Sequence, residues 1–323
     1  MTYTNALNRR TARPDRGQNR WAVILAGGDG TRLQSFTRTM TGDERPKQFC
    51  PIFGGRTLLD QTRIRIASTV PEEQILMVVT KSHERFYKQS ISMRISDRLL
   101  IQPENKGTAP AIVYALTRIA WQSPDAVVAI FPSDHYFSDD DTFMAHVETA
   151  FEAASSKIDN VILLGITPEG PEVEYGWIEP HGSGLGSLPR AISRVRRFWE
   201  KPTLNLASDL IKRGCLWNSF VMIGRVDSFL RMARRTLPEL CDLFSSIVPS
   251  FETAAEFKQL EELYSSIPST NFSHEVLALR PDDLAVMKVD KVGWSDLGEP
   301  SRVLQTLARA KVQVQWGRLH GAI

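Results

Sequence analysis

Apolar runs that alternate with helical segments constrain the fold of this chain more than any other feature of its sequence. The runs cover residues 21–27, 74–80, 98–102, 126–132 and 160–166. Continuous apolar runs of this length are typical of strands that are covered on both faces. Between them, the spacing of apolar residues predicts helices over 109–122 and 140–155. The alternation predicts an open α/β fold, with a mixed, mainly parallel sheet flanked by helices.

The second half of the chain has a different sequence pattern. Turns rich in glycine and proline follow residue 165 and lead to an extended segment, 192–202, and to a helix over 203–213. Mostly helical residues continue to about 280, and a further strand is expected over 284–290. We therefore expect an elaboration of the same sheet. The predicted organisation is a disordered basic tail (1–20), one domain (21–300), and a C-terminal helix with a short tail (301–323).

Charge and cysteine content narrow the class of protein. The chain has 323 residues and a net charge of +2, and residues 1–20 hold five Arg and one Asp, so the remainder carries −2. A nearly neutral body does not favour nucleic acid as a partner. No apolar stretch approaches the length of a membrane span. The three cysteines lack the spacing of a zinc site or a disulfide framework. We expect a cytoplasmic protein, with assembly into a homo-oligomer left open.

The stretch VILAGGDGTRL (23–33) is an apolar run that breaks into three glycines. Glycines permit a close backbone approach, and N–H groups in such a turn suit anionic oxygens. A Walker A loop is excluded by spacing, and Leu33 stands where the dinucleotide fingerprint requires glycine. A plain strand-to-helix turn is the alternative to a phosphate-binding turn. The phosphate hypothesis gains support from Lys47, which follows a stiffening proline in RPKQF (45–49).

Both halves of this pattern resemble the sugar-1-phosphate nucleotidyltransferases, whose opening motif is G-G-x-G-T-R-L followed by P-K. The matching segments are GGDGTRL (27–33) and RPKQF (45–49). The longer stretch 45–62 is most similar to the mannose-1-phosphate guanylyltransferase branch. The resemblance implies the nucleotide-diphospho-sugar transferase fold, which is Rossmann-like. It implies the transfer of a nucleotidyl group from a nucleoside triphosphate, first GTP, to a hexose 1-phosphate, first mannose 1-phosphate.

Two cations and two carboxylates carry the expected catalysis. Arg32 and Lys47 would stabilise negative charge on the phosphates. Asp134 follows the strand in AIFPSDHYF (129–137), and Asp296 lies in VDKVGWSDLGEP (289–300). Each aspartate alone is more often a turn former or a helix cap. The resemblance implies that Asp134 and Asp296 together hold one Mg²⁺, which commonly takes one or two carboxylates together with substrate phosphates.

The remaining site residues follow from segments similar to family motifs. The predicted nucleotide-binding residues are Ala26, Gly27, Gly28, Gly30, Thr31, Gln102, Gly107 and Thr108, with Thr108 as a candidate cap of the following helix. The predicted sugar-phosphate-binding residues are Gly176, Glu200, Lys201 and Asn218. Two departures bear on the choice of sugar: Phe220 stands where the family usually has glycine, and NFSHEV (271–276) replaces another family segment.

Other interpretations stay open at this stage. A thymidylyl- or uridylyltransferase for glucose 1-phosphate would share the same chemistry. A non-catalytic subunit that binds nucleotide sugars would keep the fold, and Phe220 motivates that alternative. The acidic run at 139–141 is expected to be a solvated helix start, and His135 a structural residue, because an ionised phosphate nucleophile needs no general base.

Overall fold

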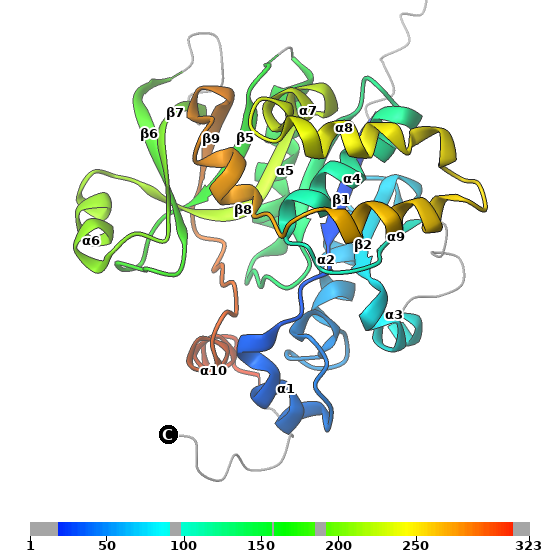
Figure 1. The fold of residues 1–323 in the computed structure, drawn as a ribbon. Helices are drawn as coiled ribbons and strands as arrows, with labels where there is room; N and C mark the ends of the chain where they lie inside the picture. The colour runs from blue at the N-terminus through cyan, green and yellow to red at the C-terminus, as the bar shows by residue number, and fades with distance from the viewer. Residues whose placement is uncertain (1–18, 91–97, 157, 185–191, 313–323) are drawn as a thin grey trace, which may run out of the picture.

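Nine strands form one sheet in the computed structural model, which describes residues 19–90, 98–156, 158–184 and 192–312 (Figure 1). Residues 1–18 of the predicted basic tail and the predicted C-terminal tail beyond 312 lie outside the described residues. The strands are β1 (Arg20–Leu25), β2 (Ile75–Thr80), β3 (Leu99–Gln102), β4 (Val127–Pro132), β5 (Val161–Ile166), β6 (Gly176–Gly184), β7 (Ile192–Glu200), β8 (Leu216–Arg225) and β9 (Leu284–Val289).

Ten α-helices are described along the same residues. They are α1 (Gln34–Thr41), α2 (Leu58–Ile66), α3 (Glu84–Ser90), α4 (Thr108–Gln122), α5 (Asp140–Ser155), α6 (Leu204–Lys212), α7 (Val226–Arg234), α8 (Pro238–Ser246), α9 (Glu256–Ser266) and α10 (Pro300–Arg309). Short 3₁₀ turns precede or follow several of them, including η1 (Thr31–Leu33) and η2 (Lys47–Phe49). The strands and helices that we predicted in the first half are confirmed, to within one or two residues at most ends.

The sheet runs in the order β3-β2-β1-β4-β8-β5-β9-β7-β6, and β6 also pairs with β8. Strands β3, β2, β1 and β4 are parallel to one another, and β5 is parallel to β9. Every described pairing of β6, β7 or β8 is antiparallel. A mixed sheet with helices is therefore confirmed, whereas the mainly parallel arrangement holds only for the first half. The difference arises because β8 enters between β4 and β5 in the opposite direction.

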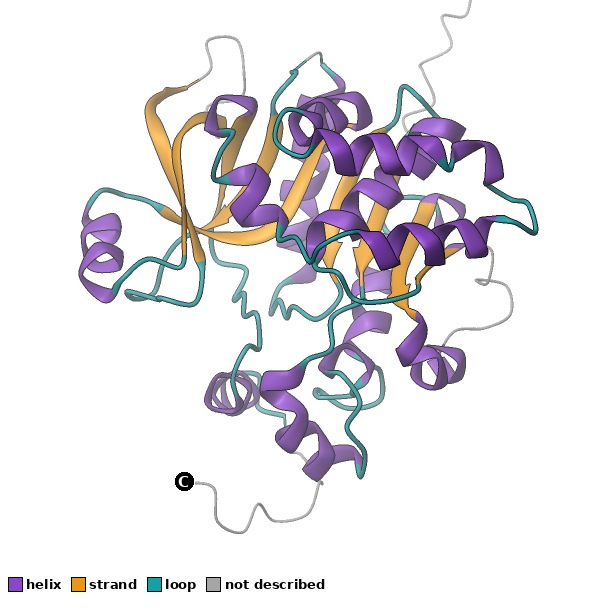
Figure 2. Cartoon of the chain, in the orientation of Figure 1, coloured by secondary structure: helices purple, strands orange, loops and turns teal. Residues whose placement is uncertain are grey.

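Helices cover both faces of the sheet, as Figure 2 shows. Apolar side chains of α2, α3 and α5 pack on one face, and those of α4, α7, α8 and α9 pack on the other. The inner strands are consequently apolar on both faces, and all six residues of β2 and of β5 are buried. This burial explains why these strands appear in the sequence as uninterrupted apolar runs.

A third, smaller apolar cluster joins α1 to α10 beside the sheet, where Figure 1 shows the two helices side by side. It contains Leu33 and Phe36 from the first segment and Leu297, Val303 and Leu307 from the last. The cluster fixes the ends of two segments that are far apart in the sequence. It thereby holds the residues that precede Lys47 close to those that surround Asp296.

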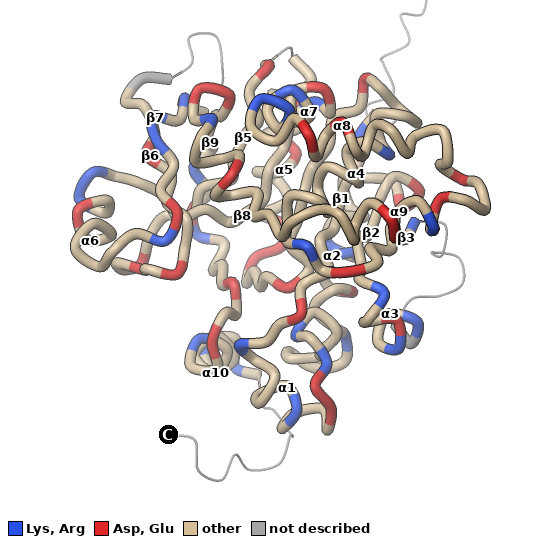
Figure 3. The backbone as a smooth tube through the Cα atoms, in the orientation of Figure 1, with Lys and Arg blue, Asp and Glu red and all other residues tan. Residues whose placement is uncertain are grey.

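Charge and cysteine chemistry agree with a neutral, reduced body. Figure 3 shows basic and acidic positions interspersed along the described chain. Cys50, Cys215 and Cys241 are buried free thiols. Burial raises the pKa of Cys50 to about 12 and the pKa of each of the other two to about 11, so all three are protonated at neutral pH. Among the described helices, none has the length and apolar character needed to cross a bilayer.

Candidate active site

The predicted site residues lie where strands of the sheet end. The glycine turn follows β1, Asp134 follows the neighbouring strand β4, and Asp296 lies in the segment after β9. An isolated antiparallel bridge between Tyr136 and Ser295 ties these last two segments together. The topology thus gathers residues separated by more than half of the chain at one edge of the sheet, as expected for ligands in open α/β folds.

The two halves of the split motif are in direct contact. Gly30 has a left-handed backbone (φ 63°), and a Cβ atom at this position would lie 3.3 Å from Cα of Pro46. Any other residue would be strained by the backbone and crowded by the proline. Gly27 is also tightly enclosed, because a Cβ there would lie 2.6 Å from Nε2 of Gln102. Gly28 differs from them, because a Cβ atom there would meet no other atom within 4 Å.

Side chains from neighbouring segments hold the carbonyl groups of the glycine turn. The amide of Gln48 donates to the carbonyls of Ala26 (3.1 Å) and Gly28 (2.8 Å). Thr80, at the end of β2, donates from its hydroxyl to the carbonyl of Gly27 (2.9 Å). Occupied carbonyls leave the N–H groups of the turn as its available polar groups. This arrangement suits an anionic ligand.

A pocket of about 320 Å³ opens beside this turn. Seven of the predicted residues line it, namely Gly27, Gly28, Gly30, Gln102, Gly107, Thr108 and Asp134. Its apolar wall includes Leu25, Val78, Ala111, Pro132 and Phe220. Gln102 is buried, and because its Oε1 accepts a hydrogen bond from Tyr264 (3.0 Å), its amide nitrogen is the group directed toward Gly27. The pocket therefore combines a polar turn with an apolar wall.

The loop from 102 to 108 packs against the segment around 270. Gly107 has φ 84°, and a Cβ there would lie 2.4 Å from the carbonyl oxygen of Thr270. The prediction that Thr108 caps the helix is wrong. Helix α4 begins at Thr108 with Gly107 as its N-cap, and the Thr108 hydroxyl instead accepts from the Phe272 N–H (2.8 Å). The hydroxyl is used to join two loops, so it leaves the helix N-terminus without a side-chain cap.

Asp29, inside the glycine turn, links the turn to the two loops across the sheet edge. One carboxylate oxygen accepts from the Asn105 amide (2.7 Å), and the other lies 3.2 Å from Nε2 of His83. Burial lowers the pKa of His83 although the Asp29 charge opposes this effect. These contacts brace the glycine turn against the segments that follow β2 and β3. Asn105 also lines the pocket.

Lys47 lies between the two candidate metal ligands. Its ammonium group is 3.2 Å from Oδ2 of Asp134 and 3.2 Å from the carbonyl oxygen of Leu297, and it also donates to the carbonyl of Asp296. An ammonium group has three donors, so these partners use all of them. The side chain is buried, with 11% of its surface exposed. Lys47 therefore provides the positive charge that keeps the carboxylate of Asp134 beside the main chain of Asp296.

Asp296 is held by three donors that converge on one oxygen. Oδ1 accepts from the Tyr175 hydroxyl (2.8 Å), from the Gly298 N–H (3.0 Å) and from the guanidinium of Arg302. Burial alone would raise the pKa of Asp296, but the charges of Lys47 and Arg302 outweigh it and keep the pKa below its usual range. The carboxylate is ionised at neutral pH. Among the described residues, none donates to Oδ2.

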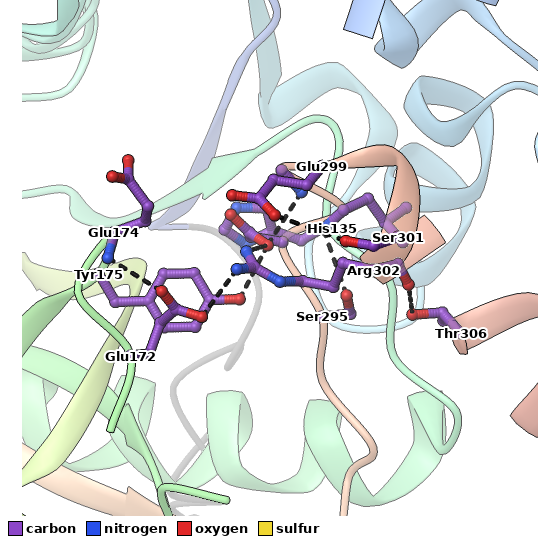
Figure 4. Close-up of polar contacts among 12 residues, drawn as sticks. His135, Glu172, Glu174, Tyr175, Ser295, Glu299, Ser301, Arg302 and Thr306 are labelled. Atoms are coloured by element: carbon purple, nitrogen blue, oxygen red, sulfur yellow. Dashed lines mark hydrogen bonds and ion pairs between the residues drawn. The ribbon is translucent and has the colours of Figure 1, made fainter. Parts of the chain in front are cut away.

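Arg302 extends from α10 toward Glu172, with its guanidinium beside the ring of Tyr175 (Figure 4). Its NH2 group donates to Oε2 of Glu172 at 2.8 Å, while NH1 reaches Asp296. A fork that bonds two carboxylates fixes both of them in place. Arg302 was not predicted, because nothing in the sequence between Pro300 and the end of the helix separates it from an ordinary surface arginine.

The donor set fits Mg²⁺ of the kind that arrives with a polyphosphate. Two aspartates share Lys47 as a neighbour, and Oδ2 of Asp296 is available for a cation. Among the described residues, no group of three or more His, Cys, Asp or Glu side chains forms a ready metal site. Two carboxylates without a third match an ion that takes its other ligands from substrate phosphates and water.

His135, next to Asp134, is mostly enclosed by its neighbours, with 13% of its side chain exposed. The indole of Trp294 donates to its Nδ1 (3.2 Å), so the ring proton belongs on Nε2. Burial lowers the pKa of His135, which makes the neutral imidazole the form present near pH 7. The acidic run at 139–141 begins α5, where Asp139 accepts from the Thr142 N–H (2.9 Å) as a helix cap.

The predicted sugar-side residues occupy three adjacent strands rather than the pocket itself. Gly176 in β6 is the register partner of Glu200 in β7, and Asn218 lies in β8, which pairs with β6. A Cβ at Gly176 would lie 2.8 Å from the Phe198 ring and 3.0 Å from Glu200. Gly176 is thus required by its own neighbours in the sheet. Burial raises the pKa of Glu200 despite the opposing charges of Lys201 and His274.

Phe220 lies at a bulge in β8 with an unusual backbone. The pairing register of β8 with β5 shifts between Leu163 and Gly165 of β5. Phe220 adopts φ 58°, a backbone region that favours glycine. The Asn218 side chain accepts from the Phe220 N–H (3.0 Å), and the Ser219 hydroxyl accepts from the Val221 N–H (3.2 Å). Phe220 lines the pocket that contains the glycine turn. Asn271, from the second departure, lines the same pocket.

Arg32 and Lys201 come together on a carboxylate that the sequence analysis did not select. Oε2 of Glu174 lies 3.2 Å from NH1 of Arg32 and 3.2 Å from Nζ of Lys201. Lys201 has a left-handed backbone (φ 44°), and its N–H donates to the carbonyl of Tyr175 (3.2 Å). Arg32 and Lys201, two of the three cations predicted to bind phosphate, are consequently neighbours, and neither lines the pocket beside the glycine turn.

Several residues of this site were therefore missed by the sequence analysis. They are Asp29, Gln48, His83, Asn105, Glu172, Glu174, Tyr175 and Arg302. Gln48 stands inside the motif RPKQF, and its position next to Lys47 was a usable signal. The others act through partners that are distant in the sequence.

Comparisons with known proteins agree with this arrangement. A family model described as nucleotidyl transferase matches residues 21–311. The xanthan biosynthesis protein XanB of Xanthomonas campestris pv. campestris (strain B100) is 31% identical over 288 residues, which cover 87% of this chain and 58% of XanB. Mannose-1-phosphate guanylyltransferase of Escherichia coli (strain K12) is 27% identical over 294 residues, covering 89% of this chain and 60% of that protein.

Among solved structures, a protein described as mannose-1-phosphate geranyltransferase from Thermus thermophilus has a TM-score of 0.76 and 28% identity. The match covers 92% of this chain and 80% of that one. The chain spans less than two thirds of the length of the curated relatives named above. The range matched by the family model, 21–311, contains the strand ends described here.

Proposed function

Because this chain belongs to the nucleotidyl transferase family, we propose that it transfers a guanylyl group from GTP to mannose 1-phosphate, giving GDP-mannose and pyrophosphate. The observation that carries the proposal is the convergence of the glycine turn, Lys47, Asp134 and Asp296 at one edge of the sheet beside a pocket. The relatives named mannose-1-phosphate guanylyltransferase support the choice of GTP and mannose 1-phosphate.

The reaction makes one bond and breaks one. An oxygen of the sugar phosphate attacks the α-phosphorus of GTP in line, the bond from that phosphorus to the bridging oxygen of the β-phosphate breaks, and pyrophosphate leaves with the electron pair. The nucleophile is already ionised, so it needs no general base. This agrees with a neutral, buried His135 beside the site.

The chain contributes mainly positioning and positive charge. The N–H groups of the turn at Gly27, Gly28 and Gly30 would bind the triphosphate, and Arg32 would stabilise charge that develops on it. Gln102 and the loop at Gly107 and Thr108 would face the nucleobase. Glu200 and Asn218 would accept and donate hydrogen bonds at the hexose, and Lys201 would bind its phosphate.

Asp134 and Asp296 would hold Mg²⁺, because no described residue donates to Oδ2 of Asp296 and because Asp134 lines the pocket beside the glycine turn. When bound, the ion supplies charge neutralisation for the phosphates. Lys47 would add positive charge beside the two carboxylates, held there by its contacts with the carbonyls of Asp296 and Leu297. A cytoplasmic setting is part of the proposal, supported by three cysteines that are buried thiols.

The test is pyrophosphate release with Mg²⁺, measured over four nucleoside triphosphates and several hexose 1-phosphates. We expect the highest kcat/KM with GTP and mannose 1-phosphate. Preference for dTTP or UTP with glucose 1-phosphate would instead assign the chain to that branch. Binding of GDP-mannose without pyrophosphate release in any combination, from folded protein, would contradict the proposed activity and identify a binding subunit.

A further inference from the structure

Glu174 occupies the position between the two cations to which the proposed function assigns phosphate ligands. Its Oε2 is 3.2 Å from Arg32 and 3.2 Å from Lys201, residues that lie 142 and 27 positions away in the sequence. A single oxygen bonded by a guanidinium and an ammonium is the environment that one phosphate oxygen would meet. The contact therefore marks an anion-binding position that is filled by the protein itself.

The main chain at Glu174 is fixed, so only its side chain is free to leave. Oε1 of Glu172 accepts from the N–H groups of Val173 (2.9 Å) and Glu174 (3.0 Å). Glu172 is itself bonded by Arg302, and its carbonyl accepts from the indole of Trp177 (2.8 Å). Figure 4 shows the Glu174 carboxylate directed away from Glu172 and Arg302. The loop is braced on one side and presents its carboxylate on the other.

The three side chains are solvent-exposed enough for exchange. The exposed fractions are 61% for Arg32, 37% for Glu174 and 53% for Lys201. Ion pairs with this exposure are weak, because water screens them and holding long side chains in one geometry costs entropy. A phosphate dianion carries twice the charge of a carboxylate and offers several oxygens to both cations. It would displace the carboxylate of Glu174.

We propose that Glu174 is a displaceable counterion that holds Arg32 and Lys201 together until the phosphate of the sugar substrate replaces it. This inference rests on the proposed function for the identity of that phosphate. It makes Arg32 and Lys201 one anion-binding pair, contributed by the glycine turn and by the end of β7. The carboxylate competes with the substrate, so removing its charge strengthens binding of phosphorylated ligands.

The experiment compares Glu174→Gln with the matched control Glu169→Gln. Glu169 is also an exposed glutamate in an ion pair, 3.0 Å from Arg309, and is not a contact of Arg32 or Lys201. Calorimetry would measure Kd for mannose 1-phosphate, inorganic pyrophosphate and uncharged mannose at low and high salt. Glu174→Gln is expected to bind the two phosphorylated ligands about threefold to tenfold more tightly at low salt, as loss of two weak ion pairs predicts.

The control variant is expected to bind like the wild type, and the gain of Glu174→Gln should shrink at high salt. Equal or weaker binding of both phosphorylated ligands by Glu174→Gln, or the same gain in Glu169→Gln, overturns the counterion role. If mannose 1-phosphate fails to bind the wild type while pyrophosphate shows the expected gain, the counterion role stands and the proposed substrate is wrong. The two failures are thereby separated.

Discussion

The ammonium group of Lys47 lies 3.2 Å from Oδ2 of Asp134, although 86 residues separate the two in the sequence. The same group bonds the main-chain carbonyls of Asp296 and Leu297. One buried cation thus connects the three segments that end at the candidate metal site, and its positive charge acts on all of them.

Replacing Lys47 with a neutral residue of similar size should damage catalysis more than folding. For Lys47→Met we expect kcat/KM for GTP to fall about 10²–10³-fold, the range found for one preorganised electrostatic group. Pyrophosphate release measures the effect, and circular dichroism checks that the variant is folded. Wild-type kcat/KM in folded Lys47→Met would rule out a catalytic role for this cation.

Neutralising either candidate metal ligand should abolish turnover. Asp134→Asn and Asp296→Asn keep the size of the side chain but remove the charge that would hold Mg²⁺. We expect pyrophosphate release to fall to background for both, and calorimetry with Mg²⁺ and GTP to show weakened metal-dependent binding. Asp139→Asn is the control, because Asp139 caps α5 and asparagine serves as an equally good cap. Full activity in either site variant would remove the metal assignment.

Two glycines that line the pocket, Gly107 and Gly28, should differ in how alanine affects the stability of the protein. Gly107→Ala should lose at least about 2 kcal/mol of unfolding free energy, because φ is 84° and the methyl group would meet the Thr270 carbonyl. Gly28→Ala should stay within about 0.5 kcal/mol of the wild type, since the space around its Cα is open.

For Gly28→Ala we also expect weaker GTP binding, because the added methyl group would occupy space in which GTP is proposed to bind. Urea denaturation measures the unfolding free energy of both variants. Calorimetry measures the affinity of Gly28→Ala for GTP. A stable Gly107→Ala would contradict the packing of the 102–108 loop. Unchanged GTP affinity in Gly28→Ala would place the triphosphate elsewhere.

The left-handed backbone of Phe220 predicts that glycine is a more stabilising replacement than alanine at this position, the reverse of the usual order. Phe220→Gly and Phe220→Ala remove the same ring, but only alanine keeps the Cβ that is unfavourable at φ 58°. We expect the glycine variant to be more stable than the alanine variant by about 1 kcal/mol, from urea denaturation. At the neighbouring Val221 the usual order, alanine above glycine, should hold. The usual order at both positions would argue against the left-handed bulge.

Glu200, proposed above to bind the hexose, should make the folded protein less stable at neutral pH. Its pKa is raised by burial above the value of 4.5 that applies in the unfolded chain. At a pH above the pKa that Glu200 has in the folded protein, its carboxylate is charged, and water solvates this charge better in the unfolded chain. Glu200→Gln should therefore be more stable than the wild type in this pH range. As the pH falls through the pKa of Glu200 in the folded protein, Glu200 of the wild type becomes protonated. Below about pH 4.5 the stability advantage of Glu200→Gln therefore disappears.

Urea denaturation at pH 8 and at pH 4 measures this difference. Glu169→Gln, on an exposed side chain, is the control and should show no such gain at pH 8. Affinity for mannose 1-phosphate should fall in Glu200→Gln because a neutral amide accepts less strongly from hydroxyl groups. A variant that is less stable than the wild type at pH 8 would contradict the raised pKa.

The strands of the parallel half could be predicted because their burial on both faces leaves an apolar run in the sequence. The glycine turn and Lys47 could be predicted together because the two segments resemble the two halves of one family motif, and the structure places Gly30 against Pro46. Strand β8 was not assigned in advance. Its segment carries Asn218 and Ser219, whose side chains replace sheet hydrogen bonds at the bulge, and this breaks the periodic pattern of a strand.

Positions whose role depends on distant partners could not be predicted. Glu174 and Arg302 resemble any surface charge until the fold places them beside Arg32 and Asp296. Phe220 was recognised as a departure from the family motif, but the direction of its side chain depends on a register shift between β5 and β8. Sequence spacing carries no information about such a shift, because it arises from the pairing of strands that are far apart in the chain.

The place of β8 in the sheet also affects how the chain folds as it is synthesised. Strands β4 and β5 leave the ribosome one after the other, yet neither becomes the neighbour of the other, because β8 lies between them. Until β8 is made, β4 has an unpaired edge, which is a hazard for aggregation. The two halves of the sheet on either side of β8 are therefore joined late, in a step that closes long-range contacts and is slow for that reason. A nascent chain that stalls before Leu216 would be a natural client for chaperones.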